Sequence, residues 1–86
     1  MYTLKIANHK IFEKDFKNIP KDKLNIINKK ILLLEKTPYI ASVKKLKSYN
    51  ISDYRLRVGD YRILFNIAEK EKTVILIRIL HRGKLY

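Results

Sequence analysis

The stretch that decides the fold is YRLRVGDYRILF, residues 54–65. Apolar and polar side chains alternate on both sides of Gly59-Asp60, and this period of two is typical of β-strands with one buried face. A two-residue turn that begins with glycine suits a tight hairpin. The sequence therefore predicts a hairpin with strands at residues 53–58 and 61–68.

The turn length also predicts the pairing of these strands. A two-residue turn places Leu56 opposite Ile63 and Arg57 opposite Arg62, and Arg55 shares the face of Arg57. Directly opposed like charges destabilise a sheet, so either arginine of this pair should be dispensable for folding, and the pair indicates an anionic ligand. The other face forms what we call the core wall: Tyr54, Leu56, Val58, Tyr61, Ile63, Phe65 and Ile67.

A third strand is predicted at residues 73–80, rich in β-branched side chains. Its apolar residues can join the core wall only if they face Ile63, Phe65 and Ile67. That pairing requires a bulge or an odd-length loop at residues 69–72. The residues so directed to the core are Ile75, Ile77 and Ile79, and those directed to the arginine face are Arg78 and Leu80.

The N-terminal half predicts one strand and two helices. Residues 1–7 alternate as a half-buried strand does, Asn8 can cap a helix, and Pro20 separates it from a second helix that Thr37-Pro38 ends. The apolar stripes are Ile11, Phe12, Phe16 and Ile19, then Leu24, Ile27, Ile31 and Leu34, the second widened by Ile26, Leu32 and Leu33.

Residues 39–52 remain as a basic connection with Leu46 as its anchor to the core. The expected fold is therefore α+β, in the order strand, helix, helix and three-strand meander. Two antiparallel helices pack on one face of a small twisted sheet.

Composition limits the function classes. The 86 residues allow one domain, 1–86, and a net charge of +12 favours a polyanionic or acidic partner. The absence of cysteine excludes disulfides and thiolate chemistry, and no metal-binding or P-loop motif occurs. Without a signal peptide or an apolar run of membrane length, a soluble cytoplasmic protein is expected.

The arginines are the candidate site residues. All five lie between positions 55 and 82, whereas the lysines are spread along the chain. Arginine suits bidentate phosphate contact, although a single exposed arginine would be an ordinary surface charge. The tail adds His81, Arg82 and Tyr86, which can supply a base, a phosphate ligand and a stacking ring.

The hairpin sequence, together with Lys45-Leu46-Lys47 before it and His81-Arg82 followed by Tyr86 after it, resembles the RelE/ParE superfamily of toxins. The resemblance spans essentially the whole chain. It implies a toxin of a type II toxin–antitoxin pair that is neutralised by a cognate acidic antitoxin. RelE-like members cleave messenger RNA on the ribosome without metal, through attack of the 2′-hydroxyl on the adjacent phosphate.

The resemblance also implies roles for residues. Arg62, His81, Arg82 and Tyr86 match catalytic positions, with Arg62 on the scissile phosphate. The residues predicted to bind RNA follow from their charge and from their places in the strands, the basic connection and the tail. They are Lys44, Lys45, Lys47, Arg55, Arg57, Arg78 and Lys84, and no cofactor or metal is expected.

Arg55 and Arg57 stand where the best-studied relatives carry lysines. Arginine stays protonated at any working pH, so the base must be His81, Tyr86 or a ribosomal group. Two other functions remain open: a ParE-like toxin that binds DNA gyrase, and a basic RNA-binding module without toxicity.

Overall fold

The computed structural model describes residues 1–47 and 50–84 of the chain. The elements are β1 (Thr3–Ile6), α1 (His9–Lys17), α2 (Lys21–Leu33), β2 (Val43–Lys45), β3 (Tyr54–Val58), β4 (Tyr61–Ala68), β5 (Thr73–His81) and the 3-10 helix η1 (Arg82–Lys84). The sheet order is β1-β5-β4-β3-β2, with β1 parallel to β5 and the other pairs antiparallel.

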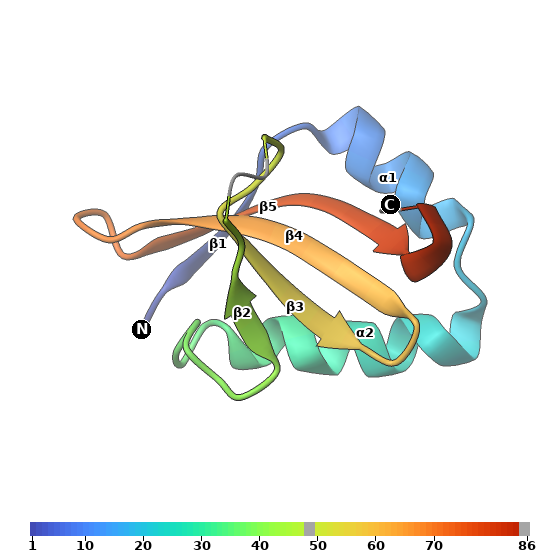
Figure 1. The fold of residues 1–86 in the computed structure, drawn as a ribbon, viewed down its shortest axis with the longest axis horizontal. Helices are drawn as coiled ribbons and strands as arrows, with labels where there is room; N and C mark the ends of the chain where they lie inside the picture. The colour runs from blue at the N-terminus through green and yellow to red at the C-terminus, as the bar shows by residue number, and fades with distance from the viewer. Residues whose placement is uncertain (48–49, 85–86) are drawn as a thin grey trace.

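Both helices pack on this sheet. Figure 1 shows α1 along β5 and α2 running back in the opposite direction past β3. The predicted α+β class is therefore confirmed, with one strand more than expected. No helix among residues 1–47 and 50–84 is long and apolar enough to span a membrane.

The predicted cap at the start of the first helix and the predicted proline before the second are confirmed. The side chain of Asn8 accepts a hydrogen bond from the backbone N–H of Ile11 at 3.1 Å, which satisfies a donor that a helix start leaves open. Pro20 precedes α2 as predicted.

The hairpin also forms as predicted. Leu56 pairs with Ile63 and Arg57 pairs with Arg62. Gly59 has a φ of +58°, and Asp60 has a negative φ, so the backbone uses the freedom of glycine at the first turn position.

The pairing of β4 with β5 follows the predicted register at one end only. Ile63 faces Ile79, but the register then shifts between Leu64 and Phe65, so that Phe65 faces Leu76. The bulge therefore lies inside the ladder, and placing it in the β4–β5 turn was wrong.

This shift changes which side chains of β5 face the core. Val74 and Leu76 are buried, whereas Ile75 and Ile77, predicted to be inward, are half-buried. Ile79 is buried as predicted. Apolar side chains occupy every position from 74 to 77, so hydrophobicity alone does not distinguish the two faces of this segment.

The core lies between the helices and one face of the sheet, and we call the opposite side of the sheet the outer face. Its buried cluster consists of Phe12, Ile19, Ile27, Ile31, Leu34, Leu56, Val58, Ile63, Phe65, Val74, Leu76 and Ile79. Other side chains predicted to be buried are exposed instead: Ile11, Ile26, Leu32 and Leu33.

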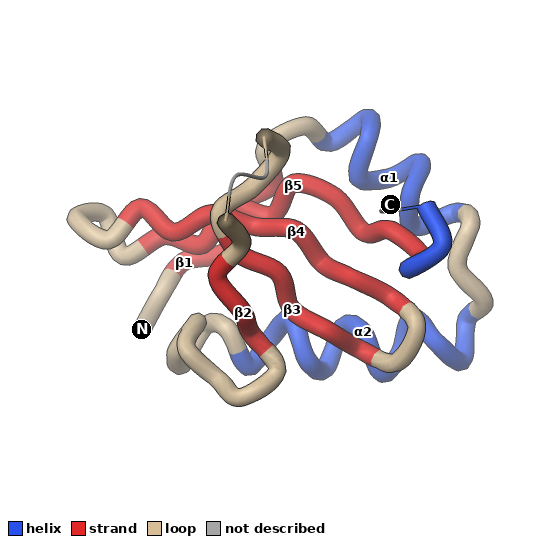
Figure 2. Tube along the Cα trace, in the orientation of Figure 1, coloured by secondary structure: helices blue, strands red, loops and turns tan. Residues whose placement is uncertain are grey.

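The connection before β3 is more ordered than predicted. Val43–Lys45 forms the edge strand β2, and Ile40 and Val43 pack on the core in the place expected for Leu46. The chain then folds back across the outer face, as the tan loop in Figure 2 shows, and the N–H of Asp53 donates to Asn66 Oδ1 of β4 at 2.6 Å.

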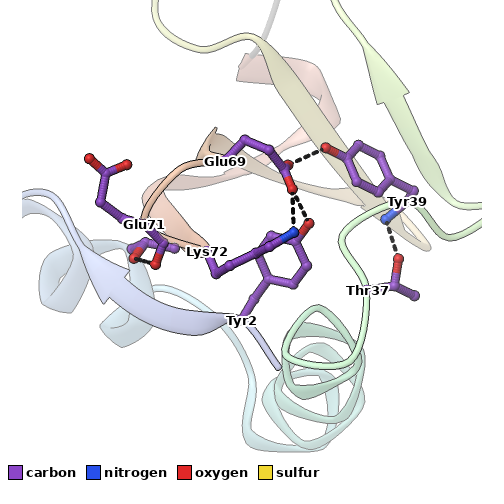
Figure 3. Close-up of polar contacts among 7 residues, drawn as sticks. Tyr2, Thr37, Tyr39, Glu69, Glu71 and Lys72 are labelled. Atoms are coloured by element: carbon purple, nitrogen blue, oxygen red, sulfur yellow. Dashed lines mark hydrogen bonds and ion pairs between the residues drawn. The ribbon is translucent and has the colours of Figure 1, made fainter.

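One carboxylate joins three distant segments at the end of the sheet that carries the β4–β5 turn (Figure 3). Glu69 accepts hydrogen bonds from the phenols of Tyr2 and Tyr39, at 2.6 and 2.7 Å, and from Lys72 Nζ at 2.9 Å. The hydrogen bonds from Tyr2, Lys72 and Tyr39 lower the pKa of Glu69 to about 2. The bond to Glu69 raises the pKa of Tyr39 to about 12.

We expect this contact to make folding sensitive to acid. Because the folded-state pKa of Glu69 lies below the ordinary value of 4.5, its contribution to stability is complete above pH 4.5 and is lost as the pH falls toward 2. Glu69→Gln should therefore reduce the difference between the free energies of unfolding at pH 6 and pH 3, measured in urea. Glu71→Gln, with the same charge change in the same turn, is the control, and an equal effect of both variants would contradict the assignment.

Candidate functional site

The outer face carries a row of cationic side chains across three strands. Arg57 of β3 lies opposite Arg62 of β4. Arg55 of β3 lies opposite Lys44 of the edge strand β2. Two like-charge pairs therefore lie side by side, and the second exists because of the strand that the sequence analysis missed.

Folding alone gives no reason for Lys44, Arg55 and Arg57 to lie opposite other cations, because directly opposed like charges destabilise a sheet. In the described parts of the chain, the carboxylates that form ion pairs bind cations outside this row: Glu69 pairs with Lys72, Asp15 with Arg78 and Asp60 with Arg82. Lys44, Arg55 and Arg57 thus stay uncompensated by any carboxylate within 4.0 Å among these residues. An anionic ligand would relieve the repulsion.

An open hollow of about 450 Å³ lies beside the row, between β2 and β3. Its lining residues are Ala41, Ser42, Val43, Lys44, Arg55, Arg57 and Gly59. The N–H of Arg57 donates to the carbonyl of Ser42 at 3.0 Å, which extends the β2–β3 pairing along the hollow. A cationic groove of this kind suits the backbone of a nucleic-acid strand.

Arg62 differs from its neighbours in being buried. Only 7% of the residue is exposed, and its Nη1 donates to the carbonyls of Gly59 and Tyr61, each at 3.2 Å. These bonds orient the guanidinium against its own turn. Arg62 therefore also stabilises the hairpin, and these contacts argue against the prediction that it is dispensable for folding. For the exposed Arg57, that prediction stands.

The end of β5 is attached to the same turn. The N–H of Arg82 donates to the carbonyl of Asp60 at 2.7 Å, and Arg82 Nε lies 3.8 Å from Asp60 Oδ1. This contact continues the register in which Arg62 faces Leu80. Arg82 is the first residue of η1, just after β5 ends. It is therefore bound to the same turn whose Gly59 and Tyr61 carbonyls accept hydrogen bonds from Arg62.

His81 faces the opposite side of the sheet. It pairs with Tyr61 of the core wall, and the two rings meet edge to face with centroids 5.3 Å apart. A hollow of about 550 Å³ between α1 and β5 is lined there by His81, Lys14 and Asn18 among others. The structure therefore attaches Arg62 and Arg82 to the same β3–β4 turn but does not place His81 on the outer face.

Arg78 binds a carboxylate of the protein itself. Its Nε and Nη2 donate to Asp15 Oδ2 and Oδ1, at 2.8 and 2.9 Å, and Asp15 Oδ2 also accepts the N–H of Ile79 at 3.1 Å. One carboxylate thus holds α1 to β5. Asp15 was not predicted from the sequence, although its spacing from Phe12 and Ile19 places it on the buried stripe of the helix.

The other predicted site residues are only partly brought together. Lys44 belongs to the outer row, whereas Lys45 pairs with Tyr54 of the core wall, and Lys47 is exposed beyond β2. Lys84 is the last residue of η1, and Tyr86 lies outside the described residues. Within the described residues, no three His, Asp or Glu side chains gather into a possible metal site.

Comparison with known proteins identifies the family. Residues 6–86 match the model described as ParE toxin of type II toxin-antitoxin system, parDE. The chain is similar to the toxin–antitoxin complex RelB–RelE from Methanococcus jannaschii, with 32% identity over 95% of this chain and 94% of that chain and a TM-score of 0.74. No curated protein sequence matches it.

Two further solved structures are similar to the chain. The archaeal RelE–RelB complex from Pyrococcus horikoshii OT3 shares 30% identity over 96% of this chain and 97% of that chain, with a TM-score of 0.78. The RelBE2 complex from Mycobacterium tuberculosis, at 24% identity and 94% and 98% coverage, has the same fold with a TM-score of 0.78. The chain belongs to the RelE/ParE superfamily and is a toxin of a type II toxin–antitoxin system.

Removal of Asp15 should destabilise the protein. Asp15→Ala leaves Arg78 and the N–H of Ile79 without their shared acceptor. Because the Arg78 side chain is 35% exposed, water offsets part of the loss, and we expect a decrease in the free energy of unfolding on the order of 2 kcal/mol. Urea unfolding measures it. Glu13→Ala, an exposed acid on the same helix, should change stability much less, and equal losses would refute this role of Asp15.

Removal of Arg57 should separate binding from folding. Arg57→Gln eliminates one like-charge pair, so the free energy of unfolding should stay constant or rise by about 0.2–1 kcal/mol. Affinity for a single-stranded RNA oligonucleotide should fall, and the slope of its logarithm against the logarithm of salt concentration should decrease by roughly 0.7 for one lost phosphate contact. Lys5→Gln on β1 is the charge-matched control. Unchanged RNA affinity in Arg57→Gln would exclude the row as a binding site.

Proposed function

We propose that the protein is a ribosome-dependent, metal-independent endoribonuclease that cleaves messenger RNA and so inhibits translation. The 2′-hydroxyl attacks the adjacent phosphate and leaves a 2′,3′-cyclic phosphate and a 5′-hydroxyl. The observation that carries this proposal is the row of opposed cations on the outer face, which a polyanion would stabilise. The similarity to two toxins named RelE, at 30 and 32% identity, supports it.

The cations suit the charge that develops in this reaction. The phosphorane transition state carries extra negative charge, and we assign its stabilisation to Arg62 and Arg82. Arg55 and Arg57 would bind the flanking phosphates, since permanently protonated arginine cannot accept the proton of the 2′-hydroxyl.

Proton transfer is assigned to His81 and Tyr86, with a ribosomal group as the alternative base. Because the His81 ring faces Tyr61 on the helix side, RNA bound on the outer face would reach it around the end of β5, where η1 begins. The role of His81 is therefore the part of the proposal that a substitution tests most directly.

The proposed protein partner is an acidic antitoxin. The net charge of +12 favours an acidic segment on the outer face, and binding should weaken as salt is added. The solved relatives from M. jannaschii and P. horikoshii are complexes with RelB antitoxins.

A second candidate function is binding to DNA gyrase without RNA cleavage. The observation that favours it is the match of residues 6–86 to the ParE toxin model. A gyrase-binding toxin needs no pair of groups for proton transfer, so the two candidates predict different effects of His81 and Tyr86 substitutions.

Cleavage assays with tail variants should decide between them. His81→Ala and Tyr86→Phe should each slow single-turnover cleavage of ribosome-bound messenger RNA by ~10²–10⁴-fold, the usual contribution of a general acid or base, with ribosome binding nearly unchanged. His9→Ala, at the exposed start of α1, should cleave as the wild type does. If both tail variants stay fully toxic and the cells show DNA damage with intact messenger, the gyrase function replaces the nuclease.

A further inference from the structure

The β3–β4 turn holds both arginines assigned to the phosphate. The carbonyls of three consecutive residues, Gly59, Asp60 and Tyr61, accept hydrogen bonds from Arg62 or Arg82. Arg62 is fixed through its side chain, whereas Arg82 is fixed through its backbone N–H. The direction of the Arg82 side chain therefore depends on another contact.

That contact is the carboxylate of Asp60. Its Oδ1 lies 3.8 Å from Arg82 Nε, and both side chains are largely exposed, at 63% and 61%. An exposed pair at this distance adds little to folding stability. It still provides one favoured direction for a long side chain at the place where β5 has ended.

Asp60 lies beside the predicted phosphate site, unlike the other acids of the β3–β5 meander. The other two acids in the β3–β5 meander, Glu69 and Glu71, lie in the β4–β5 turn at the opposite end of the sheet (Figure 1). A negative charge beside a predicted phosphate site opposes anion binding. An acid at this position thus has a cost for binding, which positioning of Arg82 would offset.

We propose that Asp60 is a positioning residue that orients the guanidinium of Arg82 beside Arg62, so that both face one phosphate. Its part in the reaction rests on the nuclease function proposed above; the orientation of Arg82 does not. Asp60 acts through Arg82 and competes weakly with the phosphate for it. Removing the carboxylate should therefore reduce turnover without weakening RNA binding.

The substitution Asp60→Asn tests this inference. Asparagine suits a tight turn, and the backbone carbonyl that binds the Arg82 N–H remains, so the fold should persist. In the free protein, the NMR order parameter of the Arg82 Nε–Hε bond should fall below about 0.6, the flexible range. That of Arg62 should not change. Glu71→Gln, with the same charge change at the far turn, should leave both unchanged.

Cleavage kinetics supply the second measurement. For ribosome-bound messenger RNA, Asp60→Asn should lower kcat roughly tenfold, as expected for a misplaced catalytic group, with KM unchanged or lower. In an Arg82→Ala background the same substitution should have no further effect on kcat, whereas in an Arg57→Gln background its effect should persist.

The possible outcomes separate the two proposals. An Arg82 order parameter that does not change in Asp60→Asn overturns the inference, and so does a wild-type kcat in that variant or a full Asp60 effect in the absence of Arg82. If the wild type cleaves no messenger RNA, the nuclease function fails. The order parameter still decides in that case whether Asp60 orients Arg82.

Discussion

The register of the β3–β4 ladder is the constraint on which the rest of the structure depends. Core residues and cations alternate along the same two strands, so one pairing places Leu56 with Ile63 inward and Arg57 with Arg62 outward. A slip of one residue would turn the arginines into the core and the apolar side chains into water. The left-handed backbone of Gly59 closes the turn that holds this register. Folding and the candidate site therefore depend on a single turn.

The bulge between Leu64 and Phe65 gives the two ends of β5 different registers with β4. Before it, β4 aligns with the last residues of β5 and sets Arg62 beside Leu80; beyond it, the shifted register leads to the segment that β1 joins in parallel. Since β1 pairs with β5 only as far as Leu76, the edge near Ile79 needs another partner. Asp15 of α1 provides it by accepting the N–H of Ile79, and the same carboxylate binds Arg78.

Features coded by neighbouring residues were predictable, and features made by distant contacts were not. The Gly59-Asp60 turn and the Asn8 cap depend on a few adjacent positions and formed as predicted. The need for a bulge followed from the apolar pattern, but its place did not, because positions 74–77 are all apolar. The strand Val43–Lys45 has only three residues and no alternation to reveal it. The role of Arg78 depends on Asp15, 63 positions away, and no local pattern pairs them.

The distribution of acids explains why the outer face keeps its charge. The chain has eight acidic residues against twenty lysines and arginines. Two of the acids in ion pairs join structural elements: Asp15 holds α1 to the sheet, and Glu69 ties the N-terminal segment to the β4–β5 turn. Lys44, Arg55 and Arg57 of the outer row have no carboxylate within 4.0 Å among the described residues, so the repulsion among these cations persists in the folded state. An anion that bridges the row removes this repulsion and binds only the folded arrangement. By linkage, its binding adds to the stability of a small protein with a thin core.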